Sequence, residues 1–184
     1  MRKALLKIHV SLDGYIRATG ADPLGWMFRT YDEELRAWEV DLLRQAGVHV
    51  MGRVLYEEMA AYWPGSTEPW APPMNEIPKV VFSKSLKEAP WRESRIADGD
   101  LAGEMAALKD EPGRDILVHG GAAIVRSLAR LGLLDEYRFL VHPVVLGGGL
   151  ALFHEQPLDL ALVDSRRFPG GTVLMAYRPI AAHA

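Results

Sequence analysis

The feature that most constrains the fold is the segment from residue 115 to residue 128, Asp-Ile-Leu-Val-His-Gly-Gly-Ala-Ala-Ile-Val-Arg-Ser-Leu. Its first part is a short apolar run, which predicts a buried strand, and its second part has apolar residues at helical spacing. Gly120 and Gly121 separate the two. Glycines at such a junction let the backbone approach a ligand closely, and the helix start offers unpaired N–H groups to a phosphate. A tight turn that binds nothing explains the pair equally well.

A second junction of the same kind follows residues 48–51. Val48, Val50 and Met51 are apolar, as in a buried strand, and Gly52 leads directly into a helical pattern that begins near Arg53. Ligands of open α/β sheets bind at the carboxyl ends of the strands. Two helix starts at two strand ends therefore predict one shared crevice for a nucleotide.

The length and charge of the chain limit the classes of protein it can belong to. With 184 residues, 49% of them hydrophobic, we expect a single domain over residues 1–184. The absence of cysteine excludes disulfides, thiolate zinc sites and cysteine nucleophiles. A net charge of −3 disfavours nucleic acid and favours a small-molecule substrate. The six histidines lack the spacing of a helical metal pair, so no metal site is expected.

The start of the chain resembles a strand more than a signal sequence. Lys7 and His9 interrupt the apolar run that follows the basic first residues. No segment has the roughly 18 uninterrupted apolar residues of a membrane-spanning helix. We therefore expect a cytoplasmic protein without a membrane partner.

Four helices are expected. Two follow Gly52 and Gly121, as described above. Thr30 and Glu33 form a capping box that predicts the start of a third helix. Asp100 predicts the N-cap of a fourth, which runs to Lys109.

Five prolines lie between residues 63 and 79 and disfavour both helix and central strand. The sequence predicts a long loop here, carrying Trp70. The loop is either a lid over the crevice or a surface connection whose aromatic residues pack against the domain.

The strand pattern defines the fold class. Strands are expected at residues 5–10, 48–51, 79–82, 95–97 and 116–118, alternating with helices. Two more, at residues 137–145 and 172–177, have no clear helix between them and are expected to be antiparallel. The prediction is a three-layer α/β/α fold with a mostly parallel central sheet, antiparallel C-terminal strands, about eight strands in all and four helices.

Six motifs occur along nearly the whole chain: Ser11-Leu-Asp-Gly-Tyr-Ile16, Met51-Gly-Arg53 with Tyr56-Glu57, Val81-Phe-Ser83, Ile116-Leu-Val-His-Gly-Gly-Ala122, Leu134-Asp-Glu-Tyr137, and Pro143-Val-Val-Leu-Gly-Gly-Gly149 with Leu152-Phe153. In this order they resemble the dihydrofolate reductase-like family, in the branch near the reductase domain of bacterial riboflavin biosynthesis. The resemblance implies a dihydrofolate reductase-like fold, NADPH bound across the carboxyl edge of the sheet, and a homodimer.

The resemblance also implies roles for particular residues. Those expected to hold the adenosine phosphates are Gly52, Arg53, Ser83, Lys84 and Ser85. Those expected around the pyrophosphate are Gly120, Gly121, Ala122, Ala123 and Ile124, and those beside the nicotinamide are Val10 and Ile16. Family members often hold the Gly-Gly peptide in the cis form. An arginine and a lysine with nearby hydroxyls suit the extra phosphate of NADPH, which favours NADPH over NADH.

The substrate side is less well defined by the sequence. Asp13 follows the first strand and is the candidate proton source, although an Asp-Gly turn former without chemistry explains it too. Tyr56 and Trp63 are candidates to line the substrate site, with plain core packing as the alternative. His119, next to Gly120, is a candidate catalytic residue, but a strand-end histidine with one satisfied hydrogen bond is the commoner case.

Two departures from the family leave the activity open. Leu55 stands where the family usually has a threonine near the pyrophosphate, and the chain lacks the cysteines of the zinc deaminase to which the riboflavin-pathway reductase is usually fused. The resulting prediction is a stand-alone NADPH-dependent reductase of a pyrimidine- or pterin-like heterocycle. The alternative is a dimeric nucleotide-binding protein of the same fold without turnover.

Overall fold

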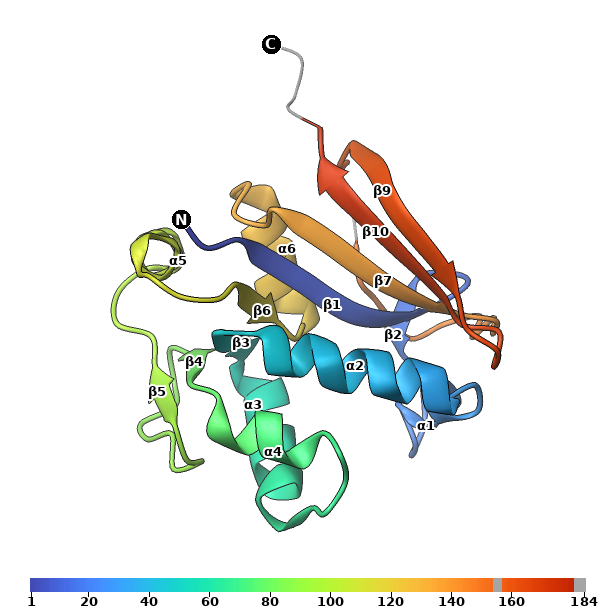
Figure 1. Cartoon of the computed structure of the whole chain (residues 1–184), viewed down its shortest axis with the longest axis horizontal. Coiled ribbons are helices and arrows are strands. Elements are labelled where there is room, and N and C mark those ends of the chain that lie inside the picture. Colours follow the sequence, from blue (N-terminus) through green and yellow to red (C-terminus); the bar gives the residue numbers. More distant parts are fainter. Residues whose placement is uncertain (154–156, 181–184) are drawn as a thin grey trace.

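The computed structural model describes residues 1–153 and 157–180, which form three layers around one large sheet (Figure 1). The sheet has eight strands in the order β5-β4-β3-β6-β1-β7-β10-β9. Their bounds are β1 Ala4–Ser11, β3 Val48–Gly52, β4 Lys79–Phe82, β5 Ser94–Ile96, β6 Ile116–Val118, β7 Glu136–His142, β9 Leu160–Arg167 and β10 Val173–Pro179. All pairings from β5 to β7 are parallel, whereas β10 is antiparallel to β7 and β9. The predicted mostly parallel sheet with antiparallel C-terminal strands is confirmed.

Helices cover both faces of the sheet. In the described ranges they are α1 Gly25–Phe28, α2 Glu33–Gln45, α3 Arg53–Tyr62, α4 Ala71–Glu76, α5 Leu101–Asp110 and α6 Ala122–Arg130, with a 3-10 turn, η1, at Trp63–Gly65. Leu6 and Ile8 of β1 pack with α5 and α6 on one face, whereas Leu5 packs with α2, α3 and α4 on the other. Figure 1 shows α2 in front of the sheet and α6 behind it. The three-layer α/β/α fold is confirmed.

The start of α2 differs from the predicted capping box. The N-cap is Asp32, whose side chain accepts a hydrogen bond of 2.9 Å from the Leu35 N–H. Thr30 instead directs its hydroxyl to Nδ1 of His142, 2.6 Å away. The predicted cap at Thr30 is therefore wrong, because a tertiary contact with His142 engages the threonine hydroxyl.

The proline-rich segment is not a continuous loop. It contains η1 and α4, and Pro72 and Pro73 occupy the first turn of α4, where a missing N–H costs nothing. The buried ammonium of Lys79 donates to the carbonyl oxygens of Met74 and Ile77 at 2.9 and 2.8 Å, which stabilises the end of this helix. The prediction of a long loop is therefore wrong for residues 71–76.

Three strands were not predicted. The edge strand β9 is exposed along most of its length, so it lacks the alternation that marks a half-buried strand. Strands β2 (Tyr15–Arg17) and β8 (Leu150–Ala151) form a separate two-stranded sheet. Within the described ranges, none of the helices is long and apolar enough to cross a membrane.

Candidate functional site

A cavity of about 1050 Å³ opens at the carboxyl ends of β1, β3, β4 and β6. Ten of the residues predicted to bind the cofactor line it: Ile16, Gly52, Arg53, Ser83, Lys84, Ser85, Gly121, Ala122, Ala123 and Ile124. Val10, 7% exposed, lies in the core beside this lining. The structure thus brings most of the predicted cofactor residues around one space, and binding of the cofactor itself stays a prediction.

The N-termini of α3 and α6 converge in this cavity. A Cβ atom added to Gly52 would lie 3.5 Å from Cγ2 of Ile124, and one added to Gly121 would lie 3.6 Å from the same atom. Neither helix start has a side-chain cap or an acidic residue in its first turn. The first N–H groups and the positive dipole ends of both helices are therefore available to one phosphorylated ligand.

The Gly120-Gly121 pair has a backbone that suits glycine alone. The φ angles are 104° and 88°, in the region that side chains avoid. A Cβ atom on Gly120 would also meet Cδ1 of Ile8 at 3.0 Å. The peptide bonds of residues 1–153 and 157–180, including this one, are trans.

Arg53 and Lys84 are among the cationic side chains that line the cavity. Arg53 donates to both carboxylate oxygens of Glu57, at 2.8 and 3.1 Å, one helical turn away. An exposed pair of this kind contributes only about 0.5 kcal/mol, so Arg53 can turn to an anion at little cost. The hydroxyl of Ser83 accepts from the N–H groups of Ser85 and Leu86 and shapes the turn after β4.

The structure assigns Asp13 a different role from the predicted proton source. Its carboxylate accepts from the Ser11 hydroxyl at 2.6 Å and from the N–H groups of Leu146 and Gly147 at 3.1 and 2.8 Å. The Ser11 hydrogen bond is the main reason why the pKa of Asp13 is lowered to about 2. Asp13 is outside the cavity lining. It anchors the Gly-rich turn and carries no proton at neutral pH.

The two aromatic candidates for the substrate site are part of the core. Tyr56 is 2% exposed, and its hydroxyl accepts a hydrogen bond of 3.0 Å from the backbone N–H of Trp91. Trp63 is half-buried and packs against the same apolar cluster. Neither lines the cavity, and their contact with a substrate stays a prediction.

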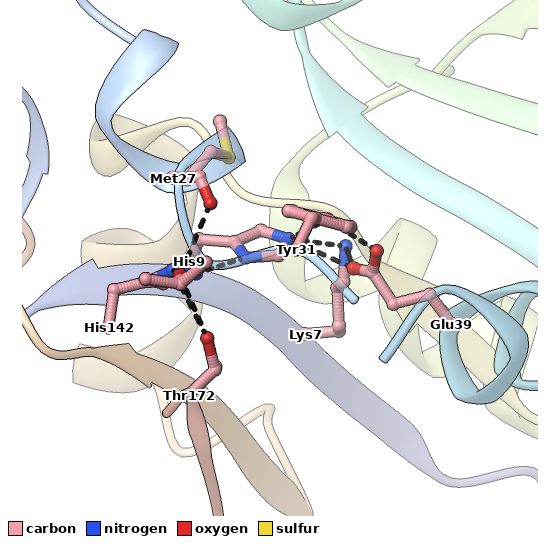
Figure 2. A network of polar contacts seen from close by, with 8 residues as sticks. Lys7, His9, Met27, Tyr31, Glu39, His142 and Thr172 are labelled. Atoms are coloured by element: carbon pink, nitrogen blue, oxygen red, sulfur yellow. Dashed lines mark hydrogen bonds and ion pairs between the residues drawn. The ribbon is translucent and has the colours of Figure 1, made fainter. Parts of the chain in front are cut away.

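Polar side chains of β1 form the part of the site that the sequence analysis missed (Figure 2). Lys7 and His9 line the cavity, and both contact the buried carboxylate of Glu39 on α2. Nε2 of His9 lies 2.9 Å from Glu39 Oε1 and 3.0 Å from Nζ of Lys7. The Tyr31 hydroxyl donates to the second oxygen of Glu39. Lys7 and Glu39 therefore form an ion pair beside the cavity, and Lys7 belongs to the cavity lining.

The network continues away from the cavity. Nδ1 of His9 lies 2.8 Å from Nε2 of His142, which is fully buried. Nδ1 of His142 lies 2.6 Å from the Thr30 hydroxyl, which in turn lies 3.1 Å from the Thr172 hydroxyl. The hydrogen bonds from Lys7 to Thr172 are thus continuous, as Figure 2 shows for most of their members.

Burial and the nearby charges determine the protonation of this network. Burial alone would raise the pKa of Glu39, but Lys7 and His9 lower it below its usual range. Burial, assisted by Lys7, lowers the pKa of His9. Burial also lowers the pKa of His142 to about 3. At neutral pH Glu39 is therefore ionised and both imidazoles are neutral.

One signal in the sequence pointed to this network. Lys7 and His9 alternate with the apolar residues Leu6, Ile8 and Val10 along a central strand whose two faces are both covered by helices. Polar residues on a covered face need buried partners. The identity of those partners depends on the tertiary structure.

The comparison with known families is decisive for the classification. The family model of the RibD C-terminal domain matches residues 2–174. The chain belongs to this family. This confirms the resemblance found in the sequence motifs. YyaP and YwjB of Bacillus subtilis (strain 168), both uncharacterised, are 32% and 30% identical to it; each alignment covers 96% of the chain and 94% and 97% of the two relatives.

Solved structures share the fold. A Shewanella sp. PV-4 protein named for riboflavin biosynthesis has a TM-score of 0.81 at 23% identity, over 97% of this chain and 99% of that one. A pyrimidine reductase-like protein of Corynebacterium diphtheriae has a TM-score of 0.68 at 14% identity, over 97% and 92%. A Thermotoga maritima deaminase/reductase has a TM-score of 0.69 at 16% identity, over 97% of this chain and 57% of the larger protein.

This RibD C-terminal domain has apolar side chains in its cavity lining, including Leu55. Leu55, in the first turn of α3, lines the cavity together with Leu24, Met27 and Met59. Lys7 and His9 line the same cavity. A flat ring with apolar faces and polar edges suits such a space.

Proposed function

We propose that the protein is an NADPH-dependent reductase that transfers a hydride to a small pyrimidine- or pterin-like heterocycle. The observation that carries this proposal is the convergence of two uncapped helix N-termini in a cavity that extends to Lys7 and His9. The structural relatives support the substrate class, because they include a pyrimidine reductase-like protein and a 5-amino-6-(5-phosphoribosylamino)uracil reductase.

The residues present suit NADPH. The N–H groups at the starts of α3 and α6 would hold its pyrophosphate, and Arg53 with Lys84 would hold the additional phosphate that distinguishes it from NADH. Ile8 and Ile16 offer an apolar surface beside the sheet end for the nicotinamide. When bound, NADPH supplies the hydride, and the protein contributes orientation and electrostatics.

Lys7 is the group best placed to supply the proton that accompanies the hydride. Its Nζ carries three protons, and only His9 and Glu39 contact it through hydrogen bonds or ion pairs among the described residues. At least one N–H therefore remains for a ligand in the cavity that Lys7 lines. Glu39, ionised and buried, holds the ammonium in place. We assign Lys7 the role of proton donor in place of Asp13.

The test combines binding with turnover. NADPH fluorescence is titrated with the protein, and NADPH oxidation is then followed with pyrimidines, pterins and flavins as candidate acceptors. Arg53→Ala should weaken NADPH binding about tenfold or more, since a charge-assisted hydrogen bond contributes about 1.5–3 kcal/mol. Arg44→Ala, which removes an exposed helix arginine outside the cavity lining, is the matched control. Absence of NADPH binding would rule out the proposal.

The second candidate is a nucleotide-binding protein without turnover. Leu55 favours this candidate, because the family usually has a threonine hydroxyl near the pyrophosphate at this position. Tight NADPH binding with no oxidation by any acceptor would support this candidate. A cytoplasmic homodimer stays a prediction for both. The edge strand β9 suits such a dimer, because Leu162 and Val163 are 55% and 44% exposed on it.

A further inference from the structure

A second pair of histidines lies beside the Lys7 network, on β3 and just after β6. Nε2 of His119 lies 2.7 Å from Nδ1 of His49, and the ring centroids are 4.6 Å apart. Nε2 of His49 lies 3.3 Å from the carbonyl oxygen of Pro73 on α4. His49 is fully buried, whereas His119 lines the cavity. The two rings form a chain of hydrogen bonds from α4 to the candidate site.

The Pro73 carbonyl, at one end of this chain of hydrogen bonds, determines which atom donates in each of them. The Pro73 carbonyl can only accept, so Nε2 of His49 carries the proton. Burial lowers the pKa of His49 to about 3, so the ring has this one proton and its Nδ1 is an acceptor. Nε2 of His119 must then donate to it. Burial, with His49 and Lys7 nearby, holds the pKa of His119 well below its usual value, so this ring is neutral too.

The remaining nitrogen of His119 is therefore a lone-pair acceptor. Within residues 1–153 and 157–180, no hydrogen bond involves Nδ1 of His119, and this side chain lines the cavity. Lys7 is its neighbour. The parallel register of β1 and β6 ends with the pair Leu6 and Val118. Lys7 and His119 directly follow this pair on the two strands, and both side chains line the cavity. A donor and an acceptor thus stand next to each other at the cavity floor.

We propose that His119 determines ligand specificity by accepting a hydrogen bond at Nδ1 from an N–H or O–H of the ligand, while Lys7 donates to an adjacent oxygen or ring nitrogen. The ligand class is a ring whose edge carries a donor beside an acceptor, as in a cyclic amide. His49 is a positioning residue, because its contact with Pro73 fixes the tautomer of His119. The ligand class rests on the proposed function, whereas the tautomer does not.

The tautomer is tested on the whole protein by long-range ¹H–¹⁵N NMR of the histidine rings. The expected result is a neutral His119 ring with its proton on Nε2. In His49→Phe the hydrogen-bond partner is lost, and the His119 ring should change to a mixture of tautomers. His49→Gln, which retains polar atoms at this position, serves as the second variant if the Phe variant fails to fold. A proton on Nδ1 of His119 in the unmodified protein would overturn the assignment.

The ligand class is tested with lumazine and 1,3-dimethyllumazine, which has the same carbonyl groups but no ring N–H. Lumazine should bind about tenfold more tightly than 1,3-dimethyllumazine. The methylated ring has no N–H to donate, so Nδ1 of His119 loses a hydrogen bond. His119→Leu should abolish the difference, and His119→Gln should restore part of it. A preference that persists in His119→Leu is steric and would overturn the assignment.

Failure of both lumazines to bind would also overturn this ligand class. The reductase proposal is judged separately by NADPH titration and by oxidation with the other acceptors.

Discussion

The buried histidines make the stability of the fold sensitive to mild acid, and His49 offers the sharpest test. Its ring is fully buried, and burial lowers its pKa to about 3, against 6.5 in the unfolded chain. Above pH 6.5 the ring is neutral in both states. Below pH 6.5 the unfolded chain binds a proton that the folded ring does not, so this contribution is lost progressively until the pH approaches 3.

The magnitude follows from the shift. At pH 5 the pH is about 1.5 units below the pKa of the ring in the unfolded chain. The free energy of unfolding therefore falls by about 2 kcal/mol between pH 7.5 and pH 5, at about 1.36 kcal/mol per unit. His142, also fully buried with a pKa of about 3, should lose a similar amount. Together these losses are a large share of the roughly 5–15 kcal/mol that stabilises a typical domain.

Urea denaturation followed by circular dichroism at several pH values between 7.5 and 5 measures this loss. His49→Gln should reduce the acid-induced loss in the free energy of unfolding by about 2 kcal/mol, because the group that titrates in the unfolded chain is gone. Arg44→Ala should leave the pH dependence as it is in the unmodified protein. Identical pH profiles for His49→Gln and the unmodified protein would refute the assignment of a neutral, buried ring.

Four further outcomes are expected. Asp13→Asn should lower the thermal midpoint of unfolding without abolishing NADPH oxidation; complete loss of turnover in a folded variant would return Asp13 to the catalytic candidates. Arg53→Ala should reduce the preference for NADPH over NADH about tenfold in fluorescence titrations, and an unchanged preference would place the extra phosphate elsewhere. Glu39→Gln should cost about 3–5 kcal/mol in urea unfolding and slow turnover, because Lys7 loses its buried partner; full activity would exclude the proposed role of that pair. Leu162→Lys should shift the mass measured by light scattering from dimer to monomer, and a dimer that persists would exclude β9 as its contact.

The sequence predicted those parts of the structure that depend on local pattern. The strand and helix on either side of Gly52 and of Gly121 have a clear change of periodicity, and Asp100 caps α5 as expected. The parallel order of the strands follows from their alternation with helices. The family motifs then place the converging N-termini of α3 and α6 at one cavity.

The candidate site was harder to predict than the fold, because partners distant in sequence decide the contacts of a side chain. Asp13 has the position of a proton donor, but the turn at Leu146 and Gly147 takes both carboxylate oxygens. Tyr56 lies on the helix after Arg53, yet it faces Trp91 in the core. Lys7 acquires its role only when α2 brings Glu39 onto the same face of β1.

The most direct test of the central claim is a crystal structure of the protein with bound NADP⁺. We expect the pyrophosphate between the N-termini of α3 and α6, the additional phosphate beside Arg53 and Lys84, and the nicotinamide ring near Ile16 with space left above Lys7. Cofactor density outside this cavity, or a cavity that stays closed to it at saturating NADP⁺, would contradict the account.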